Sequence, residues 1–318
     1  MNNTQSLFEG VVVLFLIILI AVFLKKRGIL NKEMSVTFSQ LILNVTLPAV
    51  VFSSLALRVF DSRFLTMSLI MAVIELSVIF IAWGIASLFR FERGEKGALM
   101  LVSAFGMTAF LGYPLIRQVF PGDAMAMEEA VVTSEVGVGL LLFVLGPIIA
   151  KYYGDSGDKV EGNMIMVSLK KFFTTPLFFA LAGGILFSLL HIKHEGLVFN
   201  IVFRALKFMG NANLFLVAIT IGLIFEPKKI SNMALFVALA LSLKLLVKPA
   251  FAYWLTNNGF FTDMMREIVF IETALPTAIL TAVFAKQYNC KPDLVSTTIM
   301  VGLVISLATM SLSFLIFF

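Results

Sequence analysis

The sequence predicts an all-helical membrane protein with ten transmembrane helices, and three observations support this fold class. Of the 318 residues, 60% are hydrophobic and 14% are charged, whereas a soluble domain is about 25% charged. The mean hydropathy is +1.00. Ten apolar stretches, each long enough to cross about 30 Å of hydrocarbon, follow one another between short charged segments. This composition excludes a water-soluble enzyme, a disordered chain and a secreted disulfide scaffold.

The ten predicted spans occupy most of the chain. None of them alternates with a period of two residues, which argues against a β-barrel. The first span has no basic residue before it and is followed by Lys25, Lys26 and Arg27, so we interpret it as a retained helix rather than a signal peptide. The spans lie at about 7–25, 34–57, 64–89, 97–120, 129–152, 172–191, 200–225, 231–256, 264–286 and 294–317.

Basic residues in the loops predict the orientation. Fifteen lysines and arginines follow the odd-numbered spans, and seven lie on the opposite side. The richer side is cytoplasmic by the positive-inside rule, so we expect an inner (cytoplasmic) cell membrane protein with both termini outside. The net charge of +5 then reflects topology rather than a nucleic-acid partner. The seven residues on the poorer side are Arg58, Arg63, Arg117, Lys193, Arg204, Lys207 and Arg266.

Two prolines within predicted spans indicate an internal repeat. Pro114 in span four and Pro276 in span nine are 162 residues apart, close to half of the chain, and the same offset leads from Pro48 to Gly210. Each half then holds five spans, and an odd number gives the second half the opposite topology. We therefore expect two inverted five-helix repeats, residues 1–160 and 161–318, in one membrane domain without a soluble domain.

These prolines also predict a binding site. A proline inside a helix removes a backbone hydrogen bond at a cost of about 3 kcal/mol, and hydrocarbon tolerates the break only where neighbours or a cavity satisfy the backbone. We interpret Pro114 and Pro276 as marking unwound helices, and Pro147, Pro176 and Pro249 as simple kinks. The amide groups at the start of a half-helix suit a carboxylate, so the expected substrate is an anion.

Five ionisable residues lie well inside the spans, where each costs about 2.5 to 3.5 kcal/mol by insertion scales. Lys244 is too deep to reach the interface, whereas Lys248, one turn nearer the outside, either extends to the interface or faces protein or water. Glu272, one turn before the break in span nine, could coordinate a cation, carry a proton or pair with a lysine. For Glu75 and Glu135 the structural interpretation is preferred.

The sequence does not support nucleotide binding, catalysis or metal binding. Nucleotide-binding, zinc-protease and serine-hydrolase motifs are missing. The two histidines, His191 and His194, have no neighbouring cysteine or aspartate, and Cys290 is the single cysteine. We therefore expect no catalytic residue, no metal and no cofactor. The expected protein is a secondary carrier rather than a primary pump, with a small molecule and membrane lipid as its partners.

Four motifs, in order along nearly the whole chain, resemble those of the auxin efflux carrier (AEC) family of permeases, within the bile acid/arsenite/riboflavin transporter-like superfamily. The resemblance implies a sodium/proton-antiporter-like fold with crossed broken helices in spans four and nine. It also implies a homodimer, elevator-type alternating access and transport of organic anions such as auxin, malate or malonate. The motifs are KKRGIL at 25–30, LNVTLPA at 43–49, FLGYPL at 110–115 and ALPTA at 274–278.

The resemblance and the local sequence together give a set of candidate residues. Met107 stands near the position where the family often has an asparagine, and 213–215 lack the proline usual in span seven, so nearby hydroxyl groups become the polar candidates. Candidates for ion coupling or charge balance are Glu135, Glu272, Lys244 and Lys248. The expected substrate-binding residues are Asn44, Pro48, Ser103, Thr108, Gly112, Pro114, Thr273, Pro276 and Thr277.

Two functions remain open at this point. The first is a secondary transporter of small organic anions bound at the crossing of spans four and nine, with coupling to protons or sodium undetermined. The second is a cation/proton antiporter on the same fold, for which Glu135 and Glu272 are the motivation. An intramembrane enzyme would require a catalytic pair at matched depth, which the sequence does not offer.

Overall fold

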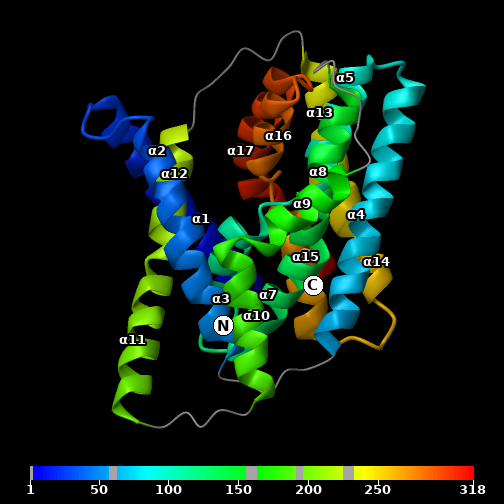
Figure 1. Ribbon diagram of the computed structural model, residues 1–318. Helices are drawn as coiled ribbons and strands as arrows, with labels where there is room; N and C mark the ends of the chain where they lie inside the picture. The colour runs from blue at the N-terminus through cyan, green and yellow to red at the C-terminus, as the bar shows by residue number, and fades with distance from the viewer. Residues whose placement is uncertain (1–2, 57–62, 155–162, 191–195, 225–232) are drawn as a thin grey trace. The chain divides into compact units, whose positions relative to one another are not determined.

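The computed structural model describes residues 3–56, 63–154, 163–190, 196–224 and 233–318. Over these residues the chain is helical (Figure 1). Seven helical runs are long and apolar enough to cross a membrane, or eight if the broken pair α9 (Met164–Phe173) and α10 (Pro176–Leu189) forms one span. The predicted class of all-helical membrane protein is confirmed. His191 and His194 lie outside the described residues.

The chain divides into two compact units, and each unit takes segments from both halves of the sequence. The units therefore do not coincide with the predicted repeats 1–160 and 161–318, which remain a prediction. Unit 1 comprises Met1–Phe64, Ala109–Val132 and Phe173–Glu226, and unit 2 comprises Leu65–Thr108, Thr133–Phe172 and Pro227–Phe318.

Unit 1 is built from two closely packed helix pairs, α1 with α12 and α3 with α10. Glycines allow this approach: a Cβ atom added to Gly222 would lie 2.5 Å from Cβ of Ala21, and one added to Gly184 would lie 2.9 Å from Cβ of Leu55. Apolar burial between the helices then stabilises the unit. Its helices are α1 (Asn3–Lys26), α2 (Met34–Leu41), α3 (Leu47–Leu55), α6 (Tyr113–Val119), α7 (Ala124–Val132), α10, α11 (Leu197–Asn211) and α12 (Asn213–Ile224).

Unit 2 contains the remaining helices, and glycines again mark close contacts. A Cβ atom on Gly137 would lie 2.7 Å from the Ser68 carbonyl oxygen, and one on Gly146 would lie 2.8 Å from the Phe284 ring. These contacts join α4 to the segment after α7, and α8 to α16. The helices are α4 (Arg63–Leu88), α5 (Arg93–Ala104), α8 (Leu140–Tyr153), α9, α13 (Ala234–Ser242), α14 (Lys248–Thr256), α15 (Asp263–Ala274), α16 (Leu280–Gln287) and α17 (Pro292–Phe317).

Three prolines each follow a short π-helix. The π-helical segments Ile42–Thr46, Thr108–Gly112 and Leu243–Val247 end two residues before Pro48, Pro114 and Pro249, respectively. The wider π turn has no i to i−4 bond for a proline to break, so the chain passes the proline while remaining helical. The expectation that helix unwinding occurs at Pro114 is therefore wrong, because Pro114 stands in the first turn of α6.

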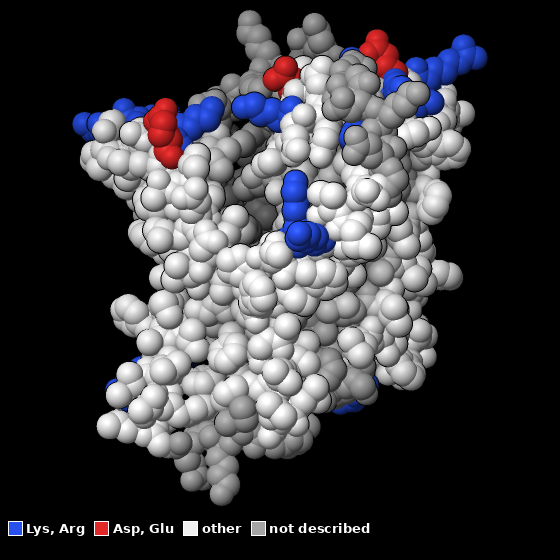
Figure 2. Space-filling model, viewed as in Figure 1, with Lys and Arg blue, Asp and Glu red and all other residues white. Residues whose placement is uncertain are grey.

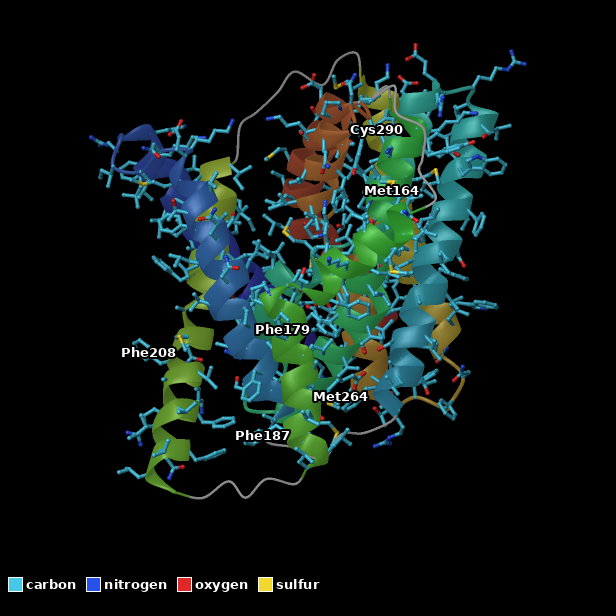
Figure 3. All side chains as sticks on the ribbon, in the orientation of Figure 1. Met164, Phe179, Phe187, Phe208, Met264 and Cys290 are labelled. Carbon is cyan, nitrogen blue, oxygen red and sulfur yellow. The ribbon has the colours of Figure 1, made fainter. Side chains whose placement is uncertain are left out.

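The surface is apolar, as a lipid-facing surface must be. On the face shown in Figure 2, broad areas carry few charged side chains. Large apolar side chains are exposed, for example Phe208 on α11 at 80% and Phe179 on α10 at 63% (Figure 3). The scarcity of charge in the composition therefore corresponds to exposed hydrocarbon-compatible surface.

Candidate functional site

The helix of span four stops inside unit 2 at Ala104. Its first half, α5, begins with a capping box in which the Glu92 backbone N–H donates to the Glu95 carboxylate at 2.9 Å. It ends at Ala104, and the next residue, Phe105, is extended with φ −77° and ψ 124°. The interruption lies at residues 105–107, before the π-helix that precedes Pro114.

The helix of span nine stops in the same way at Leu275. Its first half, α15, starts at an N-cap, Thr262, whose hydroxyl accepts from the Met265 N–H at 3.3 Å. It ends at Ala274, and Leu275 is extended with φ −63° and ψ 151°. Proline disfavours the helical region at the residue before it, so Pro276 favours the extended conformation of Leu275, although Lys248 stays helical before Pro249.

The two interrupted segments pair with each other, and we call this pairing the crossover. Gly106 and Thr277 form an antiparallel bridge. The Met107 N–H donates to the Pro276 carbonyl at 2.9 Å, and the Ala278 N–H donates to the Phe105 carbonyl at 3.0 Å. Backbone groups released by unwinding therefore satisfy one another, which is the condition for non-helical backbone at membrane depth.

Two lysines of one helical run bind the carboxyl ends of the half-helices. Lys244 Nζ donates to the Thr273 carbonyl at 3.1 Å, in the last turn of α15. Lys248 Nζ donates to the Ala104 carbonyl, the last residue of α5, at 2.5 Å. Both side chains are 0% exposed. The last carbonyls of a helix have no partner within it, so each lysine amino group stabilises one broken end by donating a hydrogen bond to it.

Lys248 also forms a buried ion pair with Glu75 of α4. Its Nζ lies 2.5 Å from Glu75 Oε1, and both side chains are 0% exposed. The ion pair gives Glu75 a structural partner, which favours its structural interpretation. Of the two alternatives for Lys248, extension to the interface is wrong, because the carboxylate and the Ala104 carbonyl bind it inside unit 2.

Gly106 and Thr277 fit the crossover for steric and hydrogen-bonding reasons. A Cβ atom on Gly106 would lie 3.2 Å from Lys244 Nζ and 3.3 Å from the Glu272 carbonyl oxygen, which is tighter than ordinary contact. The Thr277 hydroxyl donates to the Val102 carbonyl at 2.6 Å and so satisfies another end group of α5.

The other candidates in unit 2 surround the same segments. Ser103 is fully buried, and its hydroxyl has no hydrogen-bond partner among the residues that the structure describes. The Thr108 hydroxyl accepts from Ser134 at 2.5 Å. The Thr273 hydroxyl donates to carbonyls of its own helix. Glu135 and Glu272 are both buried, and Glu272 occupies the last turn of α15.

The candidates in unit 1 form a separate group. Asn44 is exposed, and its amide donates to the Gln40 carbonyl of its own helix at 2.8 Å. Pro48 is half-buried, Gly112 is buried, and Pro114 lines a small pocket. No interaction in this unit joins Asn44 to Pro114 in the part of the chain that the structure describes.

The sequence did not identify several polar residues that the structure buries. Glu128 and Glu129 are 3% and 0% exposed on α7, although they lie at the edge of the predicted span. Asn213 is 2% exposed and accepts a hydrogen bond from Thr46 at 2.7 Å. For Asn213, the signal available in the sequence was the pair of polar residues Asn211 and Asn213 within an apolar stretch.

Comparison with known proteins identifies the family. Residues 6–314 match the family described as "Membrane transport protein". An uncharacterized transporter of Methanocaldococcus jannaschii is 24% identical over 96% of each chain. Auxin efflux carrier component 8 of Arabidopsis thaliana is 20% identical over 65% of this chain and 67% of its own. Component 2 of Oryza sativa is 25% identical over 58% of this chain and 32% of its own.

The family match covers nearly the whole chain, both compact units and both strands of the crossover. It concerns transporters, not enzymes, in agreement with the absence of catalytic motifs from the sequence. The chain belongs to the membrane transport protein family that includes the auxin efflux carriers, and it is a multi-pass membrane transporter.

Proposed function

We propose that the protein is a secondary transporter of small organic anions, of the auxin-, malate- or malonate-like carboxylate class, working by elevator-type alternating access. The observation that carries the proposal is the crossover with a lysine amino group at the carboxyl end of each half-helix. Broken helices of this kind form substrate sites in secondary transporters.

The two lysines favour an anion over a metal cation. In sodium-coupled carriers, unwound carbonyls and the carboxyl ends of half-helices coordinate the ion. Here the Thr273 and Ala104 carbonyls already accept from Lys244 and Lys248. A sodium ion would have to displace these amino groups from the two carbonyls, whereas a carboxylate would not compete for the same acceptors.

The opposite end of the crossover carries partial positive charge. Helix α16 begins at Leu280, directly after the paired segment, and the start of a helix attracts an anion through its dipole, while the Thr281 and Ala282 N–H groups already donate to the Ala278 and Ile279 carbonyls. The buried Ser103 hydroxyl adds a polar group close to the end of α5. We therefore place the substrate carboxylate near the crossover, with Thr108 and Thr277 as further lining candidates.

Packing within the units supports the proposed ten spans. The interrupted spans four and nine, α5 with α6 and α15 with α16, add two crossings to the eight found by length. In unit 1, α1 packs along α12 and α3 along α10, that is, span one with seven and two with six. In an inverted five-helix repeat, span one corresponds to span six and span two to span seven, so the repeat relates the first of these pairs to the second. Both termini then lie outside, in a protein that we expect to be a homodimer of the inner membrane.

The test is uptake of labelled mono- and dicarboxylates by reconstituted vesicles, with and without proton or sodium gradients. Thr277→Val removes the hydroxyl that caps α5 and should lower uptake at least tenfold. The matched control is Thr298→Val, because Thr298 is equally buried in unit 2 but donates to the Leu294 carbonyl of its own helix at 2.8 Å. Absence of uptake for every carboxylate, in vesicles shown to contain folded protein, would reject the proposal.

Cation/proton antiport on the same fold is the second candidate. The buried carboxylates of Glu135 and Glu272 favour it. It predicts a pH-dependent sodium flux that is lost in Glu272→Gln and retained in Glu92→Gln, in which an exposed carboxylate is changed. Carboxylate uptake without such a sodium flux would exclude this candidate.

A further inference from the structure

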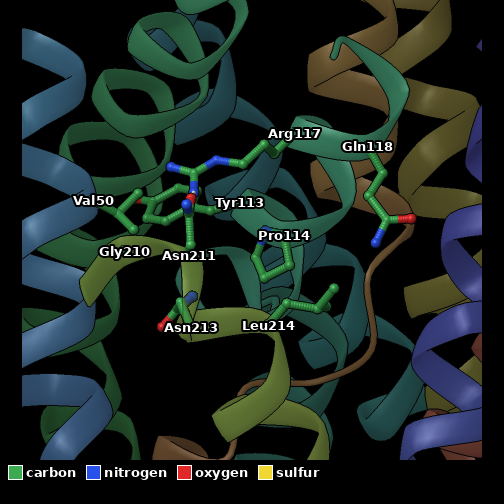
Figure 4. Close-up of a pocket in the computed structure, with 9 residues that line it drawn as sticks. All are labelled: Val50, Tyr113, Pro114, Arg117, Gln118, Gly210, Asn211, Asn213 and Leu214. Carbon is green, nitrogen blue, oxygen red and sulfur yellow. The ribbon is translucent and has the colours of Figure 1, made fainter. Parts of the chain in front are cut away.

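A second polar site lies entirely within unit 1. A pocket of about 190 Å³ is formed where α3, α6 and the junction of α11 with α12 meet. This volume is below the roughly 300 Å³ at which drug-sized ligand sites begin, so it admits an anion of only a few non-hydrogen atoms. The lining residues are Val50, Tyr113, Pro114, Arg117, Gln118, Gly210, Asn211, Asn213 and Leu214 (Figure 4).

Arg117 brings a positive charge to this pocket. It reaches from α6 to Asn211, whose Oδ1 accepts from Nη1 at 3.2 Å (Figure 4). In the described part of the chain no carboxylate forms an ion pair with it. A guanidinium has five N–H donors in a planar fork that matches a carboxylate. One bond to a neutral amide leaves most of this capacity available to a ligand.

Asn213 supplies a buried donor that lacks an acceptor. Its side chain is 2% exposed, and Oδ1 accepts from the Thr46 hydroxyl at 2.7 Å. Because that bond fixes the orientation of the amide, Nδ2 is left as the free end, and it has no hydrogen-bond partner among the described residues. Buried donors are nearly always paired, so a missing acceptor at this point is informative.

The junction of α11 and α12 forms one wall of the pocket. A single turn residue, Ala212, separates α11 from α12, which begins at Asn213 and runs for 12 residues. Close packing keeps the junction in place, since a Cβ atom on Gly210 would lie 3.1 Å from Val50 Cγ2. Val50, Pro114 and Leu214 provide the apolar walls.

We propose that this pocket is a carboxylate-binding site, in which Arg117 pairs with the anion and Asn213 Nδ2 donates a hydrogen bond to it. The ligand class is a small mono- or dicarboxylate. The inference rests on the proposed function only for this choice of anion, and its residues all belong to unit 1, whereas the crossover belongs to unit 2. It gives the transporter a binding group that the sequence motifs did not identify.

The test is binding of malonate to the purified full-length protein, followed as a concentration-dependent rise in the unfolding temperature, with neutral malonamide as the parallel probe. Malonate should stabilise the wild type saturably and malonamide should not. Arg117→Gln should weaken the apparent affinity at least tenfold, and Arg117→Lys should restore part of it. Asn213→Leu should weaken it by a smaller factor. The matched control is Arg204→Gln, because Arg204 is an exposed arginine of the same unit.

Unchanged malonate affinity in Arg117→Gln, or equal stabilisation by malonamide, would overturn the site. The unfolding temperature without ligand shows whether each variant is folded. If Arg117→Gln does not fold, Arg117→Lys serves as the second test variant. The two proposals fail in different ways. Wild-type carboxylate uptake with unchanged affinity in Arg117→Gln rejects this site and retains the transporter. Malonate binding that depends on Arg117, without uptake of any carboxylate, retains the site and rejects the transport proposal.

Discussion

At the scale of single residues, the ion pair of Lys248 and Glu75 is a fully buried electrostatic contact in unit 2. The carboxylate and the Ala104 carbonyl both accept from one ammonium group, and none of the three groups can reach water. Removing one partner from such a pair leaves a buried charge uncompensated, which is far more costly than losing a surface pair. Lys248 is therefore expected to hold α4, α5 and α14 in a single arrangement.

Lys248→Met should lower the free energy of unfolding by about 3 to 5 kcal/mol, because the Glu75 carboxylate would remain buried without its cation. The double variant Glu75→Gln with Lys248→Met should recover a substantial part of this loss. Thermal or denaturant unfolding in detergent measures both effects. Lys207→Met, at an exposed lysine, is the control. Losses that simply add in the double variant would contradict the coupling.

The Glu92 carboxylate gives a pH-dependent contact outside the membrane-spanning segments. Its hydrogen bond to Lys291 at 2.5 Å, and the positive charge of that lysine, lower the pKa of Glu92 below its ordinary value of 4.5. A depressed pKa in the folded state adds stability that is present above the ordinary pKa and is lost as the pH falls through the lowered value.

Glu92→Gln should therefore lower the unfolding temperature slightly at neutral pH. The difference from the wild type should shrink as the pH falls from about 6 to about 3, since the wild type then loses the same charge. It should also shrink at high salt, because the pair is exposed and screened. A difference that grows on acidification would show that the lowered pKa is not the cause.

At the scale of helices, glycines decide how closely neighbouring elements pack. Gly222 of α12 faces α1, and an added Cβ atom there would lie 2.5 Å from Cβ of Ala21 and 2.8 Å from the Ile18 carbonyl oxygen. Small residues at helix contacts let backbones approach in membranes. The interface between α1 and α12 thus depends on the absence of a side chain.

Gly222→Ala should destabilise the protein by about 1 to 3 kcal/mol, because the extra methyl group has no space and the helices must separate. Gly84→Ala is the matched control: Gly84 also lies within a helix, α4, but an added Cβ atom meets nothing within 4 Å. That change should be neutral or slightly stabilising, since alanine favours the helix. Equal effects of the two substitutions would refute the steric explanation.

At the scale of the whole molecule, charge and apolar surface define a membrane protein, while orientation remains a proposal. Cys290 is the single cysteine of the chain and is buried, with its thiol against the Gly94 carbonyl. Burial predicts a weakly reactive thiol. A Cys290→Ser background is therefore suited to accessibility mapping with introduced cysteines.

In that background, Arg27→Cys should react with a membrane-impermeant maleimide only from the cytoplasmic side. Asn3→Cys should react only from outside, because the basic loop after α1 is retained in the cytoplasm. Labelling of intact cells and of inverted vesicles measures both. The reverse pattern would invert the proposed topology without affecting the crossover.

The sequence by itself determined the features that depend on neighbouring residues. Apolar stretches of span length indicate helices in lipid, and the steric effect of Pro276 on Leu275 favours the interruption in span nine. Ordered motifs indicated the family, and the depth of Lys244 indicated that it faces protein or water rather than lipid. Each of these features depends on residues that are close to one another in the sequence.

Only the tertiary structure decided what depends on residues far apart. It places the interruption of span four at Gly106 rather than Pro114, because Met107 and Phe105 find hydrogen-bond partners on the span-nine segment. It joins Lys248 to Glu75, 173 residues away, and gathers Arg117, Asn211 and Asn213 around one pocket. A linear pattern shows that a buried charge or donor needs a partner, but packing selects which partner it meets.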